Sequence, residues 1–225
     1  MVMQNSKKSF LYALIFTIVV FLIGFYLGYL MEINRADKIK EILLNSELNL
    51  LDEQLRNRIV SQENLSCSLA KESVFNFADK IYKEAMLMEE YDAKSQFTNE
   101  IRLLHRRYDV LRMMLWLESS EIRKKCGENT YHSVIYLYNY AEERRDNRAK
   151  QAAFSRILED LKRNNPSEIL LIPLSANQNL DSIVLMTKVL SVKEIPSIII
   201  DDRIVINELL SARDLEKIIF QNSTS

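Results

Sequence analysis

Few residues of this sequence could take part in covalent, metal or acid–base chemistry. The chain contains two cysteines, Cys67 and Cys126, and two histidines, His105 and His132. No pair of them has the spacing of zinc ligands, and neither histidine has an acid or nucleophile partner at a motif spacing. The sequence also lacks a Gly-rich phosphate loop and a nucleophile elbow. We therefore expect no metal, no cofactor and no catalytic residue, and so a protein that is not an enzyme.

The cysteines become informative through the helices that must position them. Apolar spacing predicts one helix from about Cys67 to Glu90 and another from about Phe97 to Lys125, joined by a polar turn at Tyr91–Ser95. Trp116 is expected in the core of this hairpin. If the helices are antiparallel, Cys67 lies beside Cys126, and a disulfide would close a loop of about 58 residues, worth on the order of 4 kcal/mol. Two unrelated buried thiols are the alternative.

The N-terminal run Phe10–Met31 carries no charged residue and predicts a transmembrane helix. At 1.5 Å per residue it spans roughly 33 Å, the thickness of the hydrocarbon core. It is too long for a cleaved signal peptide, and no small-x-small cleavage site follows it. Flanking basic residues nearly balance, so they leave the orientation open. A disulfide would imply an oxidising compartment, which favours a single-pass cell-membrane protein with its N-terminus inside and its C-terminal domain extracytoplasmic.

Two features of the N-terminal half could join two copies of the chain. Gly24 and Gly28 form a GxxxG spacing, although glycines are ordinary in membrane helices. Leucines repeat at heptad spacing along a predicted juxtamembrane helix from about Ile33 to Val60, namely Leu44, Leu48, Leu51 and Leu55. This Leu44–Leu55 seam could instead pack on its own chain. The expected partners are the lipid bilayer and an unknown protein. No nucleic acid is expected, because the net charge of −1 shows no basic excess.

The C-terminal part alternates between strand and helix patterns. β-Branched and aromatic runs predict strands at Tyr131–Tyr138, Glu168–Leu174, Ile195–Asp201 and Arg203–Asn207. Helices are expected at Glu142–Asn164, at Leu180–Leu190 with Asn177 or Asn179 as its cap, and after Ser211. Two strands joined through a helix form a parallel pair, and the last two form an antiparallel hairpin. The pattern predicts a four-stranded mixed sheet with three helices.

The segment Val192–Ile219 (VKEIPSIIIDDRIVINELLSARDLEKII) and this order of elements resemble the thioredoxin fold over about residues 130–222. The resemblance implies that Pro196 is cis and that Ile195 and Pro196 form a peptide-binding edge. It places the redox motif at Tyr140–Arg145, a segment with no cysteine, so a thioredoxin-type reaction is not expected there. The cluster Glu142, Glu143, Arg144 and Arg145 is either a solvated helix face or a docking patch.

The layout, together with Leu104–Cys126 (LHRRYDVLRMMLWLESSEIRKKC), also resembles small archaeal single-span membrane proteins. The expected domains are an N-terminal tail (1–9), a transmembrane helix (10–31), an all-α juxtamembrane and hairpin region (32–126) and a degenerate α/β thioredoxin-like domain (127–222). The leading hypothesis is a redox-inactive, membrane-anchored binding or scaffold module. The alternatives are a thiol–disulfide redox protein that uses the Cys67/Cys126 pair and a structural subunit of a membrane complex.

Overall fold

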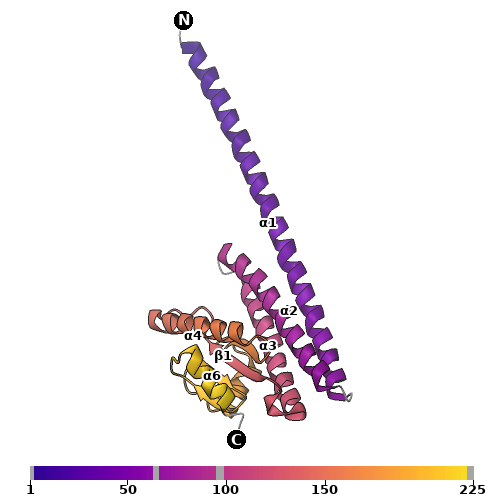
Figure 1. The fold of residues 1–225 in the computed structure, drawn as a ribbon. Coiled ribbons are helices and arrows are strands. Elements are labelled where there is room, and N and C mark those ends of the chain that lie inside the picture. Colours follow the sequence, from indigo (N-terminus) through magenta and orange to yellow (C-terminus); the bar gives the residue numbers. More distant parts are fainter. Residues whose placement is uncertain (1–2, 63–65, 95–98, 222–225) are drawn as a thin grey trace. The chain divides into compact units, whose positions relative to one another are not determined.

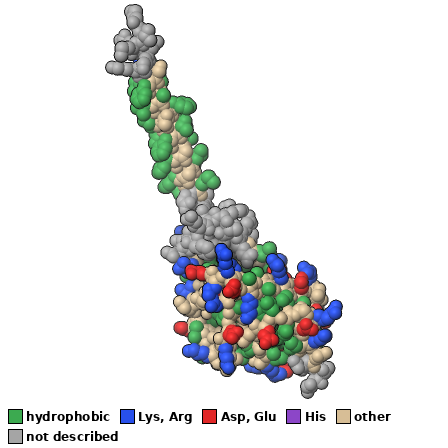
Figure 2. All heavy atoms as spheres, turned by 90° about the vertical axis from the view of Figure 1, so that its left-hand side faces the viewer, with side chains coloured by type: hydrophobic (Ala, Val, Ile, Leu, Met, Phe, Trp, Pro, Cys, Tyr) green, Lys and Arg blue, Asp and Glu red, His purple; other side chains and the backbone are tan. Residues whose placement is uncertain are grey.

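The computed structural model describes residues 3–62, 66–94 and 99–221. The chain forms two compact units, Met1–Asn49 and Leu50–Ser225. Helix α1 (Met3–Gln62) is continuous, and its segment Lys8–Met31 is long and apolar enough to cross a membrane, with a mean hydropathy of 2.6. Hydrophobic side chains cover the visible face of this segment in Figure 2, and its large apolar residues are exposed. Helix α1 thus includes residues 3–9 of the predicted tail, the predicted transmembrane helix (10–31) and the predicted juxtamembrane helix (Ile33–Val60) without a break.

Helices α2 (Cys67–Lys94) and α3 (Asn99–Cys126) lie side by side in Figure 1. The polar turn expected at Tyr91–Ser95 is wrong at residues 91–94, which remain helical, and residue 95 lies outside the described residues. Polarity alone does not end a helix, and this segment contains no Gly or Pro. The α2 side chains that reach the core are Ala70, Val74, Phe77, Ile81 and Ala85.

The four-stranded mixed sheet has the strand order β2-β1-β3-β4, and it contains the predicted parallel pair of the first two strands and the predicted antiparallel hairpin of the last two. Strands β1 (His132–Tyr138) and β2 (Ile169–Ser175) are parallel, and Ile135 faces Ile172 in their register. Strand β3 (Ser197–Ile200) runs antiparallel to β1 and to β4 (Ile204–Ile206). Strand β3 is therefore interior, while β2 and β4 are the edges.

Both faces of the sheet are buried, which explains the continuous apolar runs in its strands. Helices α4 (Arg145–Asn164) and α6 (Ala212–Gln221) cover one face, where Phe154 and Ile219 join Val134 in one core. Figure 1 shows these two helices together beside the sheet. Alternate residues such as Ile135 are buried on the other face, which α3 covers. The hairpin helix α3 is thus a layer of the sheet's own domain.

The structure therefore differs from the predicted division between residues 32–126 and 127–222. The second unit runs from Leu50 to the C-terminus, because the sheet needs α3 to cover its second face. Two shorter elements complete it, a 3₁₀ helix η1 (Glu128–Thr130) and helix α5 (Asp181–Val189). The predicted Asn177 or Asn179 cap of α5 is wrong, because its N-cap is Leu180 and makes no side-chain capping bond.

The end of α1 is held in the second unit by a charged cluster. The guanidinium of Arg56 binds the carboxylates of Glu53 and Glu118, and its Nη1 donates to Ser73 Oγ at 2.5 Å. Glu53 and Glu118 are almost completely buried. Burial and the neighbouring Glu53 carboxylate raise the pKa of Glu118 to about 8, despite the opposing effect of Arg56. Leu51 and Leu55, from the predicted seam, are more than half exposed and lie outside this core.

Candidate functional site

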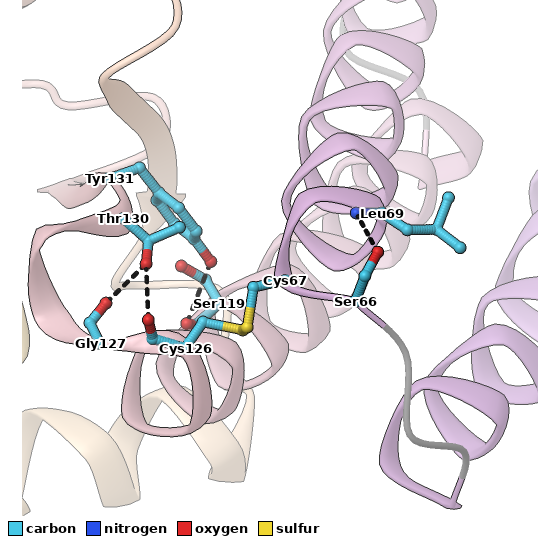
Figure 3. The surroundings of a disulfide bond; sticks show 8 residues. All are labelled: Ser66, Cys67, Leu69, Ser119, Cys126, Gly127, Thr130 and Tyr131. Atoms are coloured by element: carbon cyan, nitrogen blue, oxygen red, sulfur yellow. Dashed lines mark hydrogen bonds between the residues drawn. A yellow bond between two sulfur atoms is a disulfide. The ribbon is translucent and has the colours of Figure 1, made fainter.

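The two cysteines meet as the sequence predicts. Cys67, the first residue of α2, and Cys126, the last residue of α3, are joined by a disulfide with a Cα–Cα distance of 5.5 Å. The bridge closes the open end of the helical hairpin (Figure 3). Cys67 is exposed and Cys126 is half-buried, so solvent reaches the bond.

The chain around the bridge is held by local hydrogen bonds, shown in Figure 3. Ser66 Oγ accepts the Leu69 N–H at 3.3 Å, which caps the start of α2. At the end of α3, Gly127 has a φ of +99°, and its N–H donates to the Arg123 carbonyl at 3.0 Å. The Thr130 hydroxyl donates to the Cys126 carbonyl at 3.1 Å. Both cysteines therefore lie on fixed helix ends rather than on a loose loop.

His132 and Asp201 are brought together by the antiparallel pairing of β1 and β3. Asp201 Oδ2 lies 2.7 Å from His132 Nδ1, and Asp201 Oδ1 lies 3.0 Å from the Arg123 guanidinium. Asp201 Oδ1 also accepts the Ser133 N–H at 2.9 Å. The sequence spacing did not predict an acid partner for His132. Because His132, Ser133 and Arg123 are buried, this cluster joins α3 to the sheet rather than facing a substrate.

A second candidate site lies at the other end of the sheet, beyond the carboxyl ends of the parallel strands β1 and β2. The two loops that follow these strands are tied together by Asn177. Its Oδ1 accepts the Tyr140 N–H at 2.8 Å, and its Nδ2 donates to the Tyr140 carbonyl at 2.9 Å. Ser175 Oγ donates to Asn177 Oδ1 at 3.1 Å. Ligands of open α/β sheets bind outside the carboxyl ends of the strands, so this is the expected edge for a site.

The start of α4 is organised by Glu142. Its carboxylate accepts hydrogen bonds from the Asn139 side chain at 3.0 Å, from the Arg144 N–H at 3.0 Å and from the Asn147 side chain at 3.2 Å. These donors hold the pKa of Glu142 down at about 2, since they stabilise the charged form. Glu142 therefore shapes the loop and has little capacity left for a ligand.

Helix α3 contacts the same end of the sheet through Asp109. Its buried carboxylate accepts the Ser175 N–H at 3.2 Å and lies 3.5 Å from the Arg112 guanidinium. Burial raises the pKa of Asp109 to about 6, although Arg112 and the Ser175 N–H both act in the opposite direction. This contact fixes the end of β2 against α3.

These elements surround an open hollow of about 710 Å³. Residues from α3, the β1–α4 loop, α4 and the β2–α5 loop line it: Arg102, Arg106, Tyr140, Ala141, Glu142, Glu143, Arg148, Asn177, Gln178 and Asn179. Ala141 and Asn179 have positive φ angles of 52° and 55°, one in each loop. The His105 ring lies over Tyr140, with ring centroids 4.2 Å apart. The volume falls in the range of ligand-binding clefts.

Basic side chains outnumber acidic ones in the lining of the hollow. Arg102 and Arg106 stand four residues apart on α3, and Arg148 comes from the first turn of α4; all three are exposed. Gln178 is 7% exposed, and its Nε2 donor has no hydrogen-bond partner among the described residues. A buried donor in that state is unfavourable unless a ligand or solvent accepts its hydrogen bond.

The predicted site residues are only partly gathered here. Glu142 and Glu143 line the hollow, whereas Arg144 and Arg145 are exposed beside it. The Ile195–Pro196 bond is cis, as expected, but Pro196 is buried and precedes an interior strand that already pairs on both sides. Ser197 pairs with Leu137, so this proline stands at the same edge of the sheet. Peptide binding by Ile195 and Pro196 stays a prediction.

Sequence reasoning missed Arg102, Arg106 and Gln178. The two arginines lie near the start of α3, the helix that precedes the first strand. Only the packing of α3 on the sheet places them at this end of the sheet. Their spacing on one helix face was the available signal, but it is indistinguishable from that of a solvated face. Among the described residues, no group of three or more His, Cys, Asp or Glu side chains could hold a metal ion.

No protein-family model matches the chain, and no curated protein or solved structure is significantly similar to it. A functional assignment therefore has to rest on the residues of the site itself.

Proposed function

We propose that this protein is a membrane-anchored, redox-inactive binding module with a thioredoxin-like C-terminal domain. The strand order β2-β1-β3-β4, with one parallel and two antiparallel pairings, supports the thioredoxin-like assignment. So does the cis proline that precedes the third strand. A fold likeness argues for architecture only, so the function is argued from the site.

One observation carries the proposal: the basic hollow occupies the carboxyl edge of β1 and β2, whereas both cysteines of the chain are bonded to each other elsewhere. Thiol chemistry requires a thiolate, usually activated at a helix N-terminus. At the start of α4 this chain has Glu142 and Glu143. Loops locked by Asn177 and arginines from two helices suit holding a segment of another protein rather than transforming it.

The segment Lys8–Met31 would hold this module at a membrane. The disulfide favours an extracytoplasmic location for the module, since such bonds persist in oxidising compartments. In this arrangement the anchor keeps the binding domain near the bilayer, where the protein partner would also lie.

Site-specific photo-cross-linking in native membranes tests the proposal. A photoreactive residue replaces Glu143, which is exposed and lines the hollow, and in a matched variant it replaces Arg163, which is exposed in the last turn of α4. We expect a discrete cross-linked protein from position 143 and none from position 163. Equal adducts from both positions, or turnover of a substrate disulfide at enzymatic rates, would rule the proposal out.

The exposure of Cys67 favours a second candidate, thiol–disulfide exchange with a partner. A partner thiolate would attack the Cys67 sulfur, form a mixed disulfide and release Cys126 as a thiolate. In the Cys126→Ser variant, the free Cys67 thiolate would attack a disulfide of the oxidised partner, release one partner sulfur as a thiolate and stay in the mixed disulfide, because Cys126 is no longer there to displace it. The Cys67→Ser variant, which lacks the trapping thiol, is the control. This candidate fails if the Cys126→Ser variant accumulates no mixed disulfide and so behaves like that control.

A further inference from the structure

We propose that the hollow lined by Arg102, Arg106, Arg148 and Gln178 is a carboxylate-binding site that accepts an acidic peptide segment. This inference rests on the proposed binding function and adds the chemical class of the ligand. The site is assembled from α3, the β1–α4 loop, the first turn of α4 and the β2–α5 loop.

Positive charge dominates the groups that remain available in the hollow. Three guanidinium groups line it, against two carboxylates, and the Glu142 carboxylate is already engaged by three hydrogen-bond donors. Among the described residues, Arg102, Arg106 and Arg148 form no ion pair with a carboxylate. Each guanidinium presents a planar fork that fits a carboxylate with two parallel hydrogen bonds.

Gln178 provides a second, independent indication of a ligand. Its side chain is more than nine-tenths buried and lines the hollow, yet its Nε2 donor has no partner in the described chain. Leaving such a buried donor unsatisfied is unfavourable. A carboxylate oxygen in the hollow would accept this hydrogen bond once the Gln178 amide, whose Nε2 atom is buried in the unliganded chain, turns toward it.

The geometry of the site is largely set before a ligand arrives. Asn177 bonds both the N–H and the carbonyl of Tyr140, and the Ala176 N–H donates to the Tyr138 carbonyl at 2.8 Å. These bonds hold the two loops at a fixed separation. A preorganised site binds with a smaller loss of conformational entropy.

The charges around the hollow favour a carboxylate over a phosphate. Glu143 lies in the same lining and would repel the second negative charge of a phosphate monoester more than the single charge of a carboxylate. The hollow is also open and much larger than one oxyanion, which suits a stretch of peptide chain with the acid side chain seated among the arginines.

The test uses the full chain in nanodiscs of zwitterionic phosphatidylcholine and measures binding by fluorescence anisotropy. The probe is a fluorescein-labelled glutamate homopeptide, with a glutamine homopeptide of equal length as its neutral counterpart. The site variant is R102E/R106E. Its matched control is R156E/R213E, which changes the net charge equally at exposed positions outside the lining. Gln178→Leu removes the buried donor, and Gln178→Glu retains its shape while adding negative charge.

We expect the glutamate peptide to bind and the glutamine peptide not to bind. R102E/R106E should weaken binding about tenfold or more, and Gln178→Leu and Gln178→Glu about fivefold or more. The control variant should change affinity by less than about twofold.

Equal losses of affinity in the site and control variants would overturn the assignment of the site. Stronger competition by inorganic phosphate than by free glutamate would overturn the carboxylate assignment. A cross-link from position 143 without glutamate-peptide binding would overturn only the ligand class, whereas absence of both would remove the proposed function too.

Discussion

The indole N–H of Trp116 in α3 donates to Asp202 Oδ1 at the turn between β3 and β4, with a distance of 2.5 Å. Trp116 is completely buried, so this donor depends on Asp202. Asp201 and Asp202 both have positive φ angles, of 53° and 62°, and the Arg203 N–H donates to the Ile200 carbonyl at 3.0 Å, as in a type I′ turn. Asp202 therefore shapes the turn and also joins it to α3, the helix that covers the sheet.

Replacing Asp202 separates these two roles. Asp202→Asn keeps a side-chain oxygen and tolerates positive φ, so we expect less than about 1 kcal/mol of destabilisation. Asp202→Gly keeps the turn but leaves the indole N–H without an acceptor, which should cost about 1–3 kcal/mol. Asp202→Ala adds left-handed strain of about 1 kcal/mol. Denaturant unfolding followed by fluorescence of this single tryptophan measures the series. If Gly is as stable as Asn, the hydrogen bond contributes nothing.

Reduction of the Cys67–Cys126 bridge should destabilise the second unit. The linked residues are 59 apart in the sequence, and the chain-entropy model assigns such a loop about 4 kcal/mol. Urea unfolding with and without dithiothreitol measures the difference. The Cys67→Ser/Cys126→Ser double variant should match the reduced protein in both conditions. A reductant effect that persists in this double variant would show that the bridge is not its cause.

Thiol labelling of intact cells should reveal the side of the membrane on which the domain lies. With both cysteines bridged, a membrane-impermeant maleimide is expected to label nothing before reduction and both cysteines after mild reduction. Single Cys→Ser variants expose one thiol each without reduction and control for access. Labelling that needs permeabilised cells in every variant would place the domain in the cytoplasm and contradict the proposed orientation.

The pH dependence of stability above about pH 6 should follow Glu118, since the other buried carboxyl with a raised pKa, Asp109, titrates at about 6. Its pKa rises from about 4.5 in the unfolded chain to about 8 in the fold, so the folded state binds the extra proton between these values. This contribution is complete below pH 4.5 and is lost as the pH rises through 8, because the stability falls wherever the folded state holds more protons. The Glu118→Gln variant should have a flatter profile, so its stability relative to the parent should rise between pH 5 and pH 8. A parent that is equally stable at pH 5 and pH 8 would exclude this explanation.

The sequence was a good guide to the order of elements in the second unit. Continuous apolar runs marked the buried strands, and the helix between the first two strands required a parallel pair. The cysteines at opposite ends of two successive helices predicted their pairing. The continuity of α1 was missed because a change from apolar to polar composition looks like a boundary, whereas the backbone hydrogen bonds of a helix are indifferent to it.

The candidate site was harder to predict, since its residues meet only through tertiary packing. The sequence pointed to the start of α4, and Glu142 and Glu143 do line the hollow. It could not place Arg102 and Arg106, because nothing local shows that α3 covers the sheet rather than pairing with α2 alone. Nor could it assign Asn177, whose side chain bonds backbone atoms of a residue 37 positions earlier instead of capping α5.

The two hydrogen bonds between the Asn177 side chain and the Tyr140 backbone give a last prediction about the site. Asn177→Ala removes both hydrogen bonds to the Tyr140 backbone, which should destabilise the domain by about 1–2 kcal/mol. Its larger effect should be local: the Tyr140 amide, no longer bonded, should exchange with deuterium at least about tenfold faster. Ser182→Ala, at an exposed position in α5, is the control and should leave this amide protected.

Asn177→Asp keeps the acceptor for the Tyr140 N–H but places a carboxylate against the Tyr140 carbonyl. We therefore expect it to protect the amide and still weaken binding in the hollow. If all three variants exchange like the parent, the two loops are held by other contacts and the site is not preorganised by Asn177.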